Sequence, residues 1–458
     1  MASEEELEDL KKKFASLFDG QAAQFVVSCP GRVNLIGEHI DYSGYGVLPM
    51  ALEKRVTALV RVDATSKKLE LRNVDSRYEP FSCSVREYEI QRGQPKWHDY
   101  FLCGHRGMTE QLAAMGHNSL PLGMQVLVEG TIPPSAGLSS SSALVCCAAL
   151  VTLKAQTRVD FDVMHRGRVA ELCAQCERYI GTEGGGMDQA ICMLAQSGKA
   201  KKIDFHPLRE EDVQLPEESV FVVAHCCTEL NKAATGHFNL RVVECRLAAL
   251  VLAKKCGVAD WKACWTLSAV QKALKLSLME MGELVGKHIK EEVYNRKDIL
   301  EELSVDDEEL TADFLTPNTA QAAAFELRKR ALHVYAEAAR VLAFASACAG
   351  AGDASDKSRV LGRLMNDSHT SCSRLYECSS PELDELVACC LKAGALGSRL
   401  TGAGWGGCTV SLVPKDEVVE FKRRLKETFY DKTEERQRRF DSAVFVSGAG
   451  GGAVVFDI

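Results

Sequence analysis

Several features that would assign this chain to a particular class of protein are missing from its sequence. It has no apolar run of about 18 residues, so no segment is predicted to span a membrane. The first six residues are acidic overall and lack an apolar core, so we expect no secretory signal peptide. Long basic blocks are also missing and the net charge is −8, which makes nucleic acids and anionic membranes poor candidate partners. Internal repeats, heptad arrays and long low-complexity tracts are absent.

What is present is the composition of a globular protein. The chain has 458 residues, of which 46% are hydrophobic and 26% charged, enough for two or three domains with buried cores. Its 19 cysteines lie mostly inside apolar runs, which is typical of reduced, buried thiols, and we therefore expect a cytoplasmic protein. Cys173 and Cys176 have the spacing of a zinc or redox pair. No second pair stands at ligand distance, so packing inside a helix is the favoured interpretation.

The most informative stretch is a serine-rich loop at residues 130–143, GTIPPSAGLSSSSA. Pro133 and Pro134 stiffen its approach, and Gly137 allows a tight bend. Four serines then precede the apolar run 143–150, which predicts a buried helix with serine at its N-terminus. Free backbone N–H groups and the helix dipole make such a terminus an anion site suited to phosphate. The Gly-Lys-Ser/Thr ending of a Walker loop is missing, and a flexible linker is disfavoured because eight apolar residues follow at once.

A second polar stretch follows a predicted short strand at residues 24–29. Residues 30–42, PGRVNLIGEHIDY, place Arg32, Asn34, Glu38, His39 and Asp41 among apolar residues and glycines. The pattern fits a loop that presents polar side chains to a ligand, and it fits a surface turn with ordinary salt bridges equally well. A metal site at Glu38, His39 and Asp41 is less favoured, because zinc ligands are usually further apart in sequence.

Two acids flank a glycine-rich break in the middle of the chain. Glu177 lies near the end of a helix predicted over residues 162–180, where its charge opposes the helix dipole and favours a cation nearby. Residues 181–186 contain four glycines, and Asp188 stands just past them, after Met187. The two carboxylates can converge on one site from this arrangement. An alternative for Asp188 is the N-cap of the helix that begins there.

Aromatic and glycine patterns give two further candidates. Trp97 and Tyr100 share one face of a helix that begins after Pro95; core packing explains them most simply, and a wall for a nucleotide base is the sharper alternative. Gly402, Gly404 and Gly407 satisfy G-x-G-x-x-G, but a strand follows where a dinucleotide fold requires a helix. They therefore predict a glycine turn between strands, where another backbone or a ligand can approach closely.

The remaining pattern predicts alternating strands and helices. We expect an amphipathic helix at residues 4–19, strands at 56–62, 68–72, 124–129 and 219–225, and helices at 239–255 and 319–349. Residues 266–315 are predicted to be helical and acidic. Prolines and acids near residues 205–218 suggest a domain boundary, so we expect one domain at residues 1–210 and a second at 211–458.

A phosphate cradle, a candidate metal-binding acid, a candidate base and an arginine are the parts needed for phosphoryl transfer. Residues 30–42 resemble the galactokinase signature, the serine-rich loop resembles the ATP-binding motif of the GHMP small-molecule kinases, and residues 397–409 resemble their third motif. Within that superfamily the chain is most similar to the N-acetylgalactosamine kinases, on the strength of Pro133 and Pro134, the serines at 139–142, GGGMD at 184–188 and NKAA at 231–234.

The resemblance implies an α/β fold, also described as α+β, in which two domains close over a cleft holding ATP, Mg²⁺ and a sugar. Asp188 would be the base that faces the anomeric hydroxyl, and Arg32 would keep it ionised and offset charge on the moving phosphoryl group. Ser141 and Glu177 would reach Mg²⁺. The implied sugar-binding residues are Arg32, Glu38, His39, Asp41, Gly185, Asp188 and Phe238. The implied nucleotide-binding residues are Trp97, Gly137, Ser139, Ser140, Ser141, Asn231 and Lys232.

One position separates near relatives in this resemblance. Many galactokinases carry Tyr beside the sugar where this chain has Phe238, and loss of that hydroxyl would favour a bulkier neighbour such as an acetamido group. We therefore expect a sugar-1-kinase that prefers N-acetylgalactosamine, with galactose second, and that acts as a monomer on small molecules alone. A non-catalytic sugar sensor is disfavoured because the serine-rich loop, Arg32 and Asp188 are all intact. The signature at residues 37–41 argues against a mevalonate or homoserine type.

Overall fold

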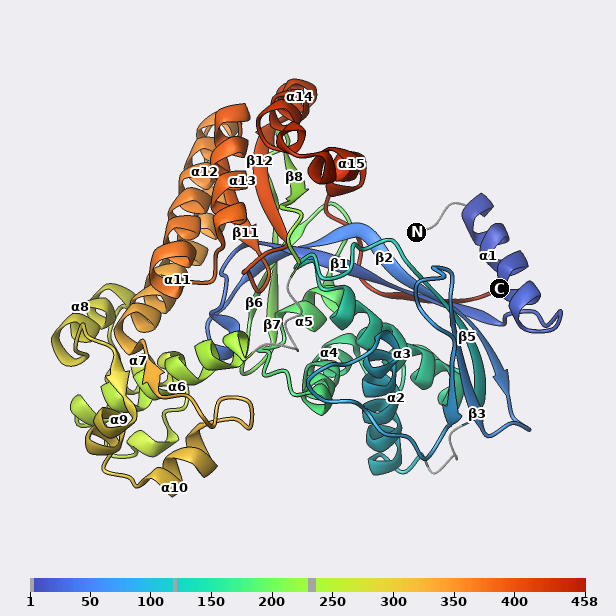
Figure 1. The fold of residues 1–458 in the computed structure, drawn as a ribbon, viewed down its shortest axis with the longest axis horizontal. Helices are drawn as coiled ribbons and strands as arrows, with labels where there is room; N and C mark the ends of the chain where they lie inside the picture. The colour runs from blue at the N-terminus through green and yellow to red at the C-terminus, as the bar shows by residue number, and fades with distance from the viewer. Residues whose placement is uncertain (1–3, 118–121, 230–235) are drawn as a thin grey trace.

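Two antiparallel-rich sheets form the centre of the molecule, shown in Figure 1. The computed structural model describes residues 4–117, 122–229 and 236–458. The larger sheet has six strands in the order β14-β1-β2-β5-β3-β4, antiparallel except for the β3–β5 pair. Its strands are β1 (Phe25–Ile36), β2 (Leu48–Asp63), β3 (Lys68–Asn73), β4 (Phe81–Ser84), β5 (Gly123–Gly130) and β14 (Val454–Asp457).

Helices cover both faces of the larger sheet. Helix α1 (Glu4–Leu17), predicted from its amphipathic spacing, packs Leu10 and Phe14 against Leu59 and Leu127 on one face. On the other face lie four helices whose buried sides make the main core with β1 and β2. These are α2 (Trp97–Ala114), α3 (Ser140–Thr157), α4 (Arg166–Cys176) and α5 (Met187–Leu194).

A second sheet of four strands has the order β11-β12-β8-β13. Helices α12 to α15 pack around it, with α11 beside α12, and the chain then returns so that its last strand, β14, pairs with β1 of the larger sheet. The strands are β8 (Ser219–His225), β11 (Gly397–Thr401), β12 (Cys408–Pro414) and β13 (Val444–Ser447). The helices are α11 (Leu327–Ala349), α12 (Ala354–Ser371), α13 (Pro381–Ala393), α14 (Val418–Thr428) and α15 (Glu434–Ala443).

The region between β8 and α11 is mainly helical, as its acidic, periodic sequence predicts. Two short two-stranded ladders accompany the large sheets, one beside the glycine-rich break and one inside this helical region. The helices are α6 (His237–Lys255), α7 (Leu267–Leu274), α8 (Leu278–His288), α9 (Arg296–Leu303) and α10 (Asp307–Glu309). The ladders are β6 (Ala200–Asp204) with β7 (Arg209–Val213), and β9 (Tyr294–Asn295) with β10 (Ala324–Phe325).

The structure corrects three predicted boundaries. Strand β1 does not stop at Cys29 but continues to Ile36, so Arg32 and Asn34 lie on a strand rather than in a loop. Irregular register beside Pro30 and after Asn34 lets β1 keep its pairing with β2. The helix expected from residue 162 begins at Arg166 and its last turn is a 3₁₀ helix, and the helix expected from residue 319 begins at Leu327.

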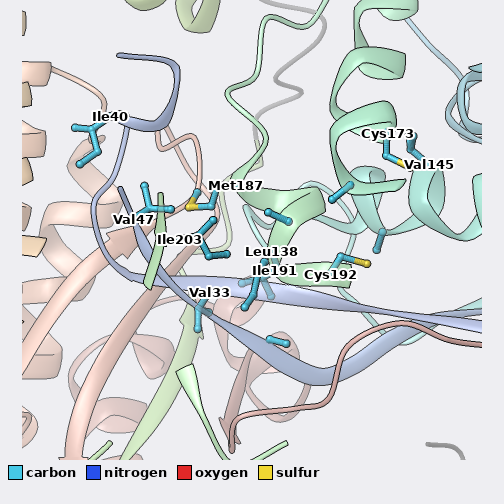
Figure 2. Close-up of a cluster of buried hydrophobic side chains, with 14 of the residues drawn as sticks. Val33, Ile40, Val47, Leu138, Val145, Cys173, Met187, Ile191, Cys192 and Ile203 are labelled. Carbon is cyan, nitrogen blue, oxygen red and sulfur yellow. The ribbon is translucent and has the colours of Figure 1, made fainter. Parts of the chain in front are cut away.

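Every cysteine of the chain is a free thiol, and most are buried, as the composition predicts. No helix within the described ranges is long and apolar enough to cross a membrane. Figure 2 shows how the core fixes the elements that carry the candidate site: Val33 of β1, Leu138 of the serine-rich loop and Ile191 of α5 lie in one buried cluster. The relative positions of those three elements are therefore set by close packing.

Candidate active site

The serine-rich loop ends at the N-terminus of α3, as predicted. Gly137 and Ser139 adopt left-handed conformations, with φ of 73° and 61°, and Ser140 is the first helical residue. Helix α3 is buried almost all round, so its N-terminus is held rigidly. The buried hydroxyl of Ser139 has no hydrogen-bond partner among the described residues. An unpaired hydroxyl beside free helical N–H groups is what an incoming phosphate oxygen would satisfy.

The glycine turn between β11 and β12 lies against this loop. A side chain at Gly137 would meet the carbonyl of Thr401 at 2.8 Å, and one at Gly402 would meet the backbone of Gly137. Gly407 similarly leaves room for the carbonyl of Ala136. The close backbone approach predicted for this turn is thus confirmed, and its partner is the serine-rich loop.

A cavity of about 330 Å³ opens beside the loop. Trp97, Tyr100 and Tyr78 line one part of it, so the two aromatic residues that share a helix face both line a cavity and pack against the core. The Trp97 indole N–H donates to the Glu79 carbonyl at 3.0 Å, which fixes the ring. The residues assigned to the nucleotide from the resemblance that line this cavity are Trp97, Gly137, Ser139, Ser140 and Ser141. Asn231 and Lys232 lie outside the described residues.

A second, smaller cavity lies on the other side of Asp188. All seven residues assigned to the sugar line it, although they come from β1, the turn after it, the glycine-rich break, α5 and α6. They are Arg32, Glu38, His39, Asp41, Gly185, Asp188 and Phe238. Arg32, Asp188 and Ala403 line both cavities. The carboxylate of Asp188 therefore stands where a group could pass from one cavity to the other.

Asp188 and Arg32 form the ion pair at this junction. The Arg32 Nε donates to Asp188 Oδ1 at 2.7 Å, and its Nη2 lies 2.6 Å from the same oxygen. The Ser142 hydroxyl donates to Oδ2 at 3.3 Å. Asp188 is the second residue of α5, whose N-cap is Gly186, so the alternative in which Asp188 caps this helix is wrong. A carboxylate oriented by an arginine in a largely buried site fits a general base.

Glu38 is almost fully buried, at 2% exposure, and is paired with Arg399 of β11. The Arg399 Nη2 donates to Glu38 Oε2 at 2.9 Å. Glu38 also lines the smaller cavity, where its carboxylate can accept from a ligand hydroxyl. Burial raises the pKa of Glu38, and the positive charges of Arg399 and Arg32 oppose that rise.

The His39 ring has a defined proton arrangement. Its Nε2 lies 2.9 Å from the Ala403 carbonyl, and since a carbonyl only accepts, Nε2 carries the proton. In the neutral ring Nδ1 then accepts from the Tyr42 hydroxyl at 2.8 Å, and Tyr42 in turn lies 2.6 Å from the Tyr376 hydroxyl. The Phe238 ring packs against the rings of His39 and Tyr42, with centroids 5.6 and 5.7 Å away. This wall of the smaller cavity is therefore aromatic and fixed.

Glu177 is buried, at 5% exposure, and its Oε1 accepts from Gln189 Nε2 at 2.8 Å. It lines the smaller cavity, whereas Ser141 lines the larger one. Hydroxyl and carboxylate oxygens are the donors that Mg²⁺ prefers, and this ion usually takes few protein ligands and keeps water and phosphate oxygens. The donor chemistry of these two residues therefore fits a magnesium ion carried by a nucleotide.

Four functional candidates escaped the sequence reasoning. Ser142 belongs to the serine run but was not distinguished from its neighbours, and Tyr42 ends the first motif without a signal of its own. Arg399 and Ala403 lie in the third motif, where the glycines dominate the pattern. The partners of Arg399 and Ala403 are more than three hundred residues away in sequence, so no local pattern indicates these two contacts.

A helix N-terminus for phosphate next to an acid–arginine pair, shared by two cavities, defines a phosphotransferase that acts on a small molecule. Comparison with known proteins agrees. Residues 12–62 match the galactokinase galactose-binding signature, residues 105–196 the GHMP kinases N terminal domain, and residues 357–431 the GHMP kinases C terminal family. A galactokinase of Dictyostelium discoideum is 38% identical over 448 residues, covering 93% of this chain and 88% of that protein. One of Saccharomyces cerevisiae is 32% identical, covering 98% and 94%.

Solved structures show the same fold. The galactokinase of Lactococcus lactis complexed with galactose superposes with a TM-score of 0.74 at 24% identity, covering 98% of this chain and 99% of that one. The mevalonate kinase of Methanococcus jannaschii reaches a TM-score of 0.52 at 16% identity, covering 93% and 98%. The chain belongs to the galactokinase family of the GHMP kinases. It is a sugar kinase, a phosphotransferase with an alcohol group as acceptor.

Proposed function

We propose that the protein transfers the γ-phosphoryl group of ATP to the anomeric C1 hydroxyl of a galactose-configured sugar. The observation that carries this proposal is the Asp188–Arg32 pair at the junction of the two cavities, with a phosphate-type helix N-terminus on one side and a polar, aromatic pocket on the other. Small-molecule substrates suffice for this activity, and the monomeric state and cytoplasmic location remain predictions.

The reaction follows from the positions of the side chains. The sugar lies in the smaller cavity with its C1 hydroxyl toward Asp188, and ATP lies in the larger cavity with its phosphates on the α3 N-terminus. As the C1 oxygen bonds to the γ-phosphorus, the bond to the β–γ bridging oxygen breaks, ADP leaves, and Asp188 takes the hydroxyl proton. Arg32 orients Asp188 and faces the negative charge on the transferred group.

Three serines and one acid complete the nucleotide site. The unpaired hydroxyl of Ser139 and the N–H groups of Ser140 and Ser141 would bind phosphate oxygens. Ser141 and Glu177 would hold Mg²⁺, which supplies positive charge to the phosphates when bound. Gln189 orients Glu177 through the bond between its amide and the carboxylate.

Two sugars are the candidates for the acceptor. The similarity to proteins named galactokinase supports galactose as the acceptor. Phe238 favours N-acetylgalactosamine, because its ring contacts His39 and Tyr42 and offers no hydroxyl to the sugar, which leaves an apolar surface for an acetamido methyl group. We therefore retain N-acetylgalactosamine as the preferred acceptor and galactose as the second.

Steady-state kinetics with both sugars, side by side and at saturating MgATP, test this proposal. A higher kcat/KM for N-acetylgalactosamine is expected, and Phe238→Tyr should move the ratio toward galactose. A wild-type protein that favours galactose would overturn the preference but leave the sugar-1-kinase intact. If ³¹P NMR detects no sugar phosphate with either sugar, the result would contradict the activity itself.

A further inference from the structure

Helix α11 holds the backbone of Glu38 from outside the sugar cavity. Its residues His333 and Glu337 are four apart and so project from one face of the helix. Glu337 Oε1 accepts the backbone N–H of Gly37 at 2.8 Å and that of Glu38 at 3.2 Å. His333 Nε2 lies 3.0 Å from the Glu38 carbonyl and must donate to it. The N–H and the C=O of one residue are thus bound by two side chains of one helix.

The turn needs such partners because its backbone is irregular. Gly37 has a φ of 105° and His39 a φ of 61°, so neither strand nor helix bonds can satisfy the groups between them. These groups are buried, and an unpaired buried N–H or C=O costs about as much as a lost hydrogen bond. Glu337 itself is fully buried, at 0% exposure, as is His333. The contact is therefore part of the interior and excludes water.

Polar and charged groups on α12, on β11 and on α11 itself complete the network. Glu337 also accepts from the Ser368 hydroxyl of α12 at 2.7 Å and from Arg340 Nε at 2.7 Å. Arg399 of β11 reaches Ser368 at 3.1 Å as well as Glu38. Burial alone would raise the pKa of Glu337, but Arg340, Arg399, His333 and Ser368 together lower it to about 2, so it is an anion at neutral pH. Burial lowers the pKa of His333 to about 4, so that ring is neutral.

A purely structural role does not explain so many buried charges. Burying ion pairs gives little net stability, because desolvation offsets much of the attraction, and apolar residues of similar volume often serve as well. What the network does fix is geometry: it holds the peptide of Glu38 on both sides and its carboxylate on one oxygen, at a residue that lines the sugar cavity. From this geometry we propose that Glu337 is a positioning residue for sugar binding, acting through Glu38. The inference rests on the proposed function, since it concerns the sugar cavity of that site.

The test compares two buried glutamates: Glu337, which binds the backbone of Glu38, and Glu244, which binds groups away from the sugar cavity. Glu337→Gln keeps the shape of the side chain but removes its charge. It also puts an amide NH₂ group, which can only donate, among groups that themselves donate to the carboxylate. Glu244→Gln is the matched control: Glu244 is 2% exposed, accepts from Arg330 Nε at 2.7 Å and from the Glu326 N–H at 2.9 Å, and does not line the sugar cavity. Ser368→Ala is a milder second variant that removes one donor to Glu337 and one acceptor of Arg399, and leaves the charges of both residues in place.

The readouts separate positioning from folding. We expect Glu337→Gln to raise the sugar KM, and the sugar Kd measured by calorimetry, about 10- to 100-fold while the KM for ATP changes by less than about twofold. Ser368→Ala should raise the sugar KM by a few fold in the same direction. Glu244→Gln should lower the melting temperature and leave both KM values near those of the wild type.

Several outcomes would overturn the inference. Equal rises in the KM for sugar and for ATP, or a loss of kcat alone, would assign Glu337 a general structural role. A sugar KM that rises as much in Glu244→Gln would mean that any lost buried charge disturbs the site. If Glu337→Gln fails to fold, an unchanged sugar KM in Ser368→Ala would be decisive against positioning. A wild-type protein that phosphorylates no sugar would instead contradict the proposed function.

Discussion

Three separate segments of the chain meet at the carboxylate of Asp188. Arg32 comes from β1, Ser142 from the first turn of α3, and Asp188 itself from the first turn of α5. The N-terminal end of α5 adds a favourable dipole for the anion. Arg32 also donates through Nη1 to the Gly137 carbonyl at 2.5 Å, so the same guanidinium ties the base to the phosphate loop. The Arg32 side chain therefore fixes the candidate base and the serine-rich loop relative to each other.

For single residues, the clearest prediction concerns Asp188→Asn. The amide has the size of the carboxylate but cannot take the proton of the sugar hydroxyl, so we expect kcat to fall about 10²- to 10⁴-fold. The nucleotide lies on the α3 N-terminus, so its Kd, measured by calorimetry with ADP, should change little. Ser142→Ala serves as a control because it removes one bond to Asp188 and leaves the base in place. Near-normal turnover in Asp188→Asn would remove Asp188 from the role of base.

Among the elements, the serine-rich loop with α3 was predictable from sequence because its signals are local. Prolines, a glycine, serines and an apolar run follow one another and specify a loop that becomes a buried helix. Strand β1 was predicted too short because its continuation depends on distant partners: β2 beside it and the loop at Leu138. The division of the chain near residue 210 remains a prediction.

The candidate site was also predictable only where its signals are local in the sequence. Arg32 and Asp188 were paired only through the resemblance to a family, because they are 156 residues apart and spacing cannot bring them together. Glu337 and Arg399 were missed altogether, since each is an ordinary charged residue in its own segment and gains its role only when α11 and β11 pack beside the turn at Glu38. Long-range pairing of this kind is a product of tertiary packing, which a single sequence does not display.

At the scale of elements, the contact between the glycine turn and the serine-rich loop should be sensitive to Gly402→Ala. Gly402 has a φ of 85°, and a Cβ there would press on the backbone of Gly137. Gly198 has the same φ of 85° with nothing within 4 Å of a Cβ, so Gly198→Ala measures the backbone strain alone, about 1–2 kcal/mol. We expect Gly402→Ala to lose more stability than this control and to raise the KM for ATP. Equal stability and equal KM in the two variants would contradict the contact.

For the molecule as a whole, three buried histidines make the stability of the fold depend on pH. His105 lies on α2 beside the larger sheet, His225 on β8 of the smaller one, and His333 on α11. All three are buried, at 3% exposure or less, and burial lowers the pKa of each to about 4. An unfolded histidine titrates near 6.5. Between about pH 6.5 and 4 the unfolded chain therefore binds more protons than the folded one.

The sign of the pH effect follows from this difference. These histidines favour folding fully above about pH 6.5, and their contribution is lost as the pH falls toward 4, at up to about 1.4 kcal/mol per pH unit for each. Glu337, with its pKa lowered to about 2, acts in the same direction from about pH 4.5 downward, while the raised pKa of Glu38 opposes it in part. We expect the melting temperature to be nearly constant from pH 7 to 8 and to fall steeply between pH 6.5 and 4.5. His105→Gln, which removes one titrating group from a site where the Tyr88 hydroxyl lies 2.7 Å from the ring Nδ1, should flatten that fall. A melting temperature independent of pH over this range would show that these rings are protonated in the folded protein.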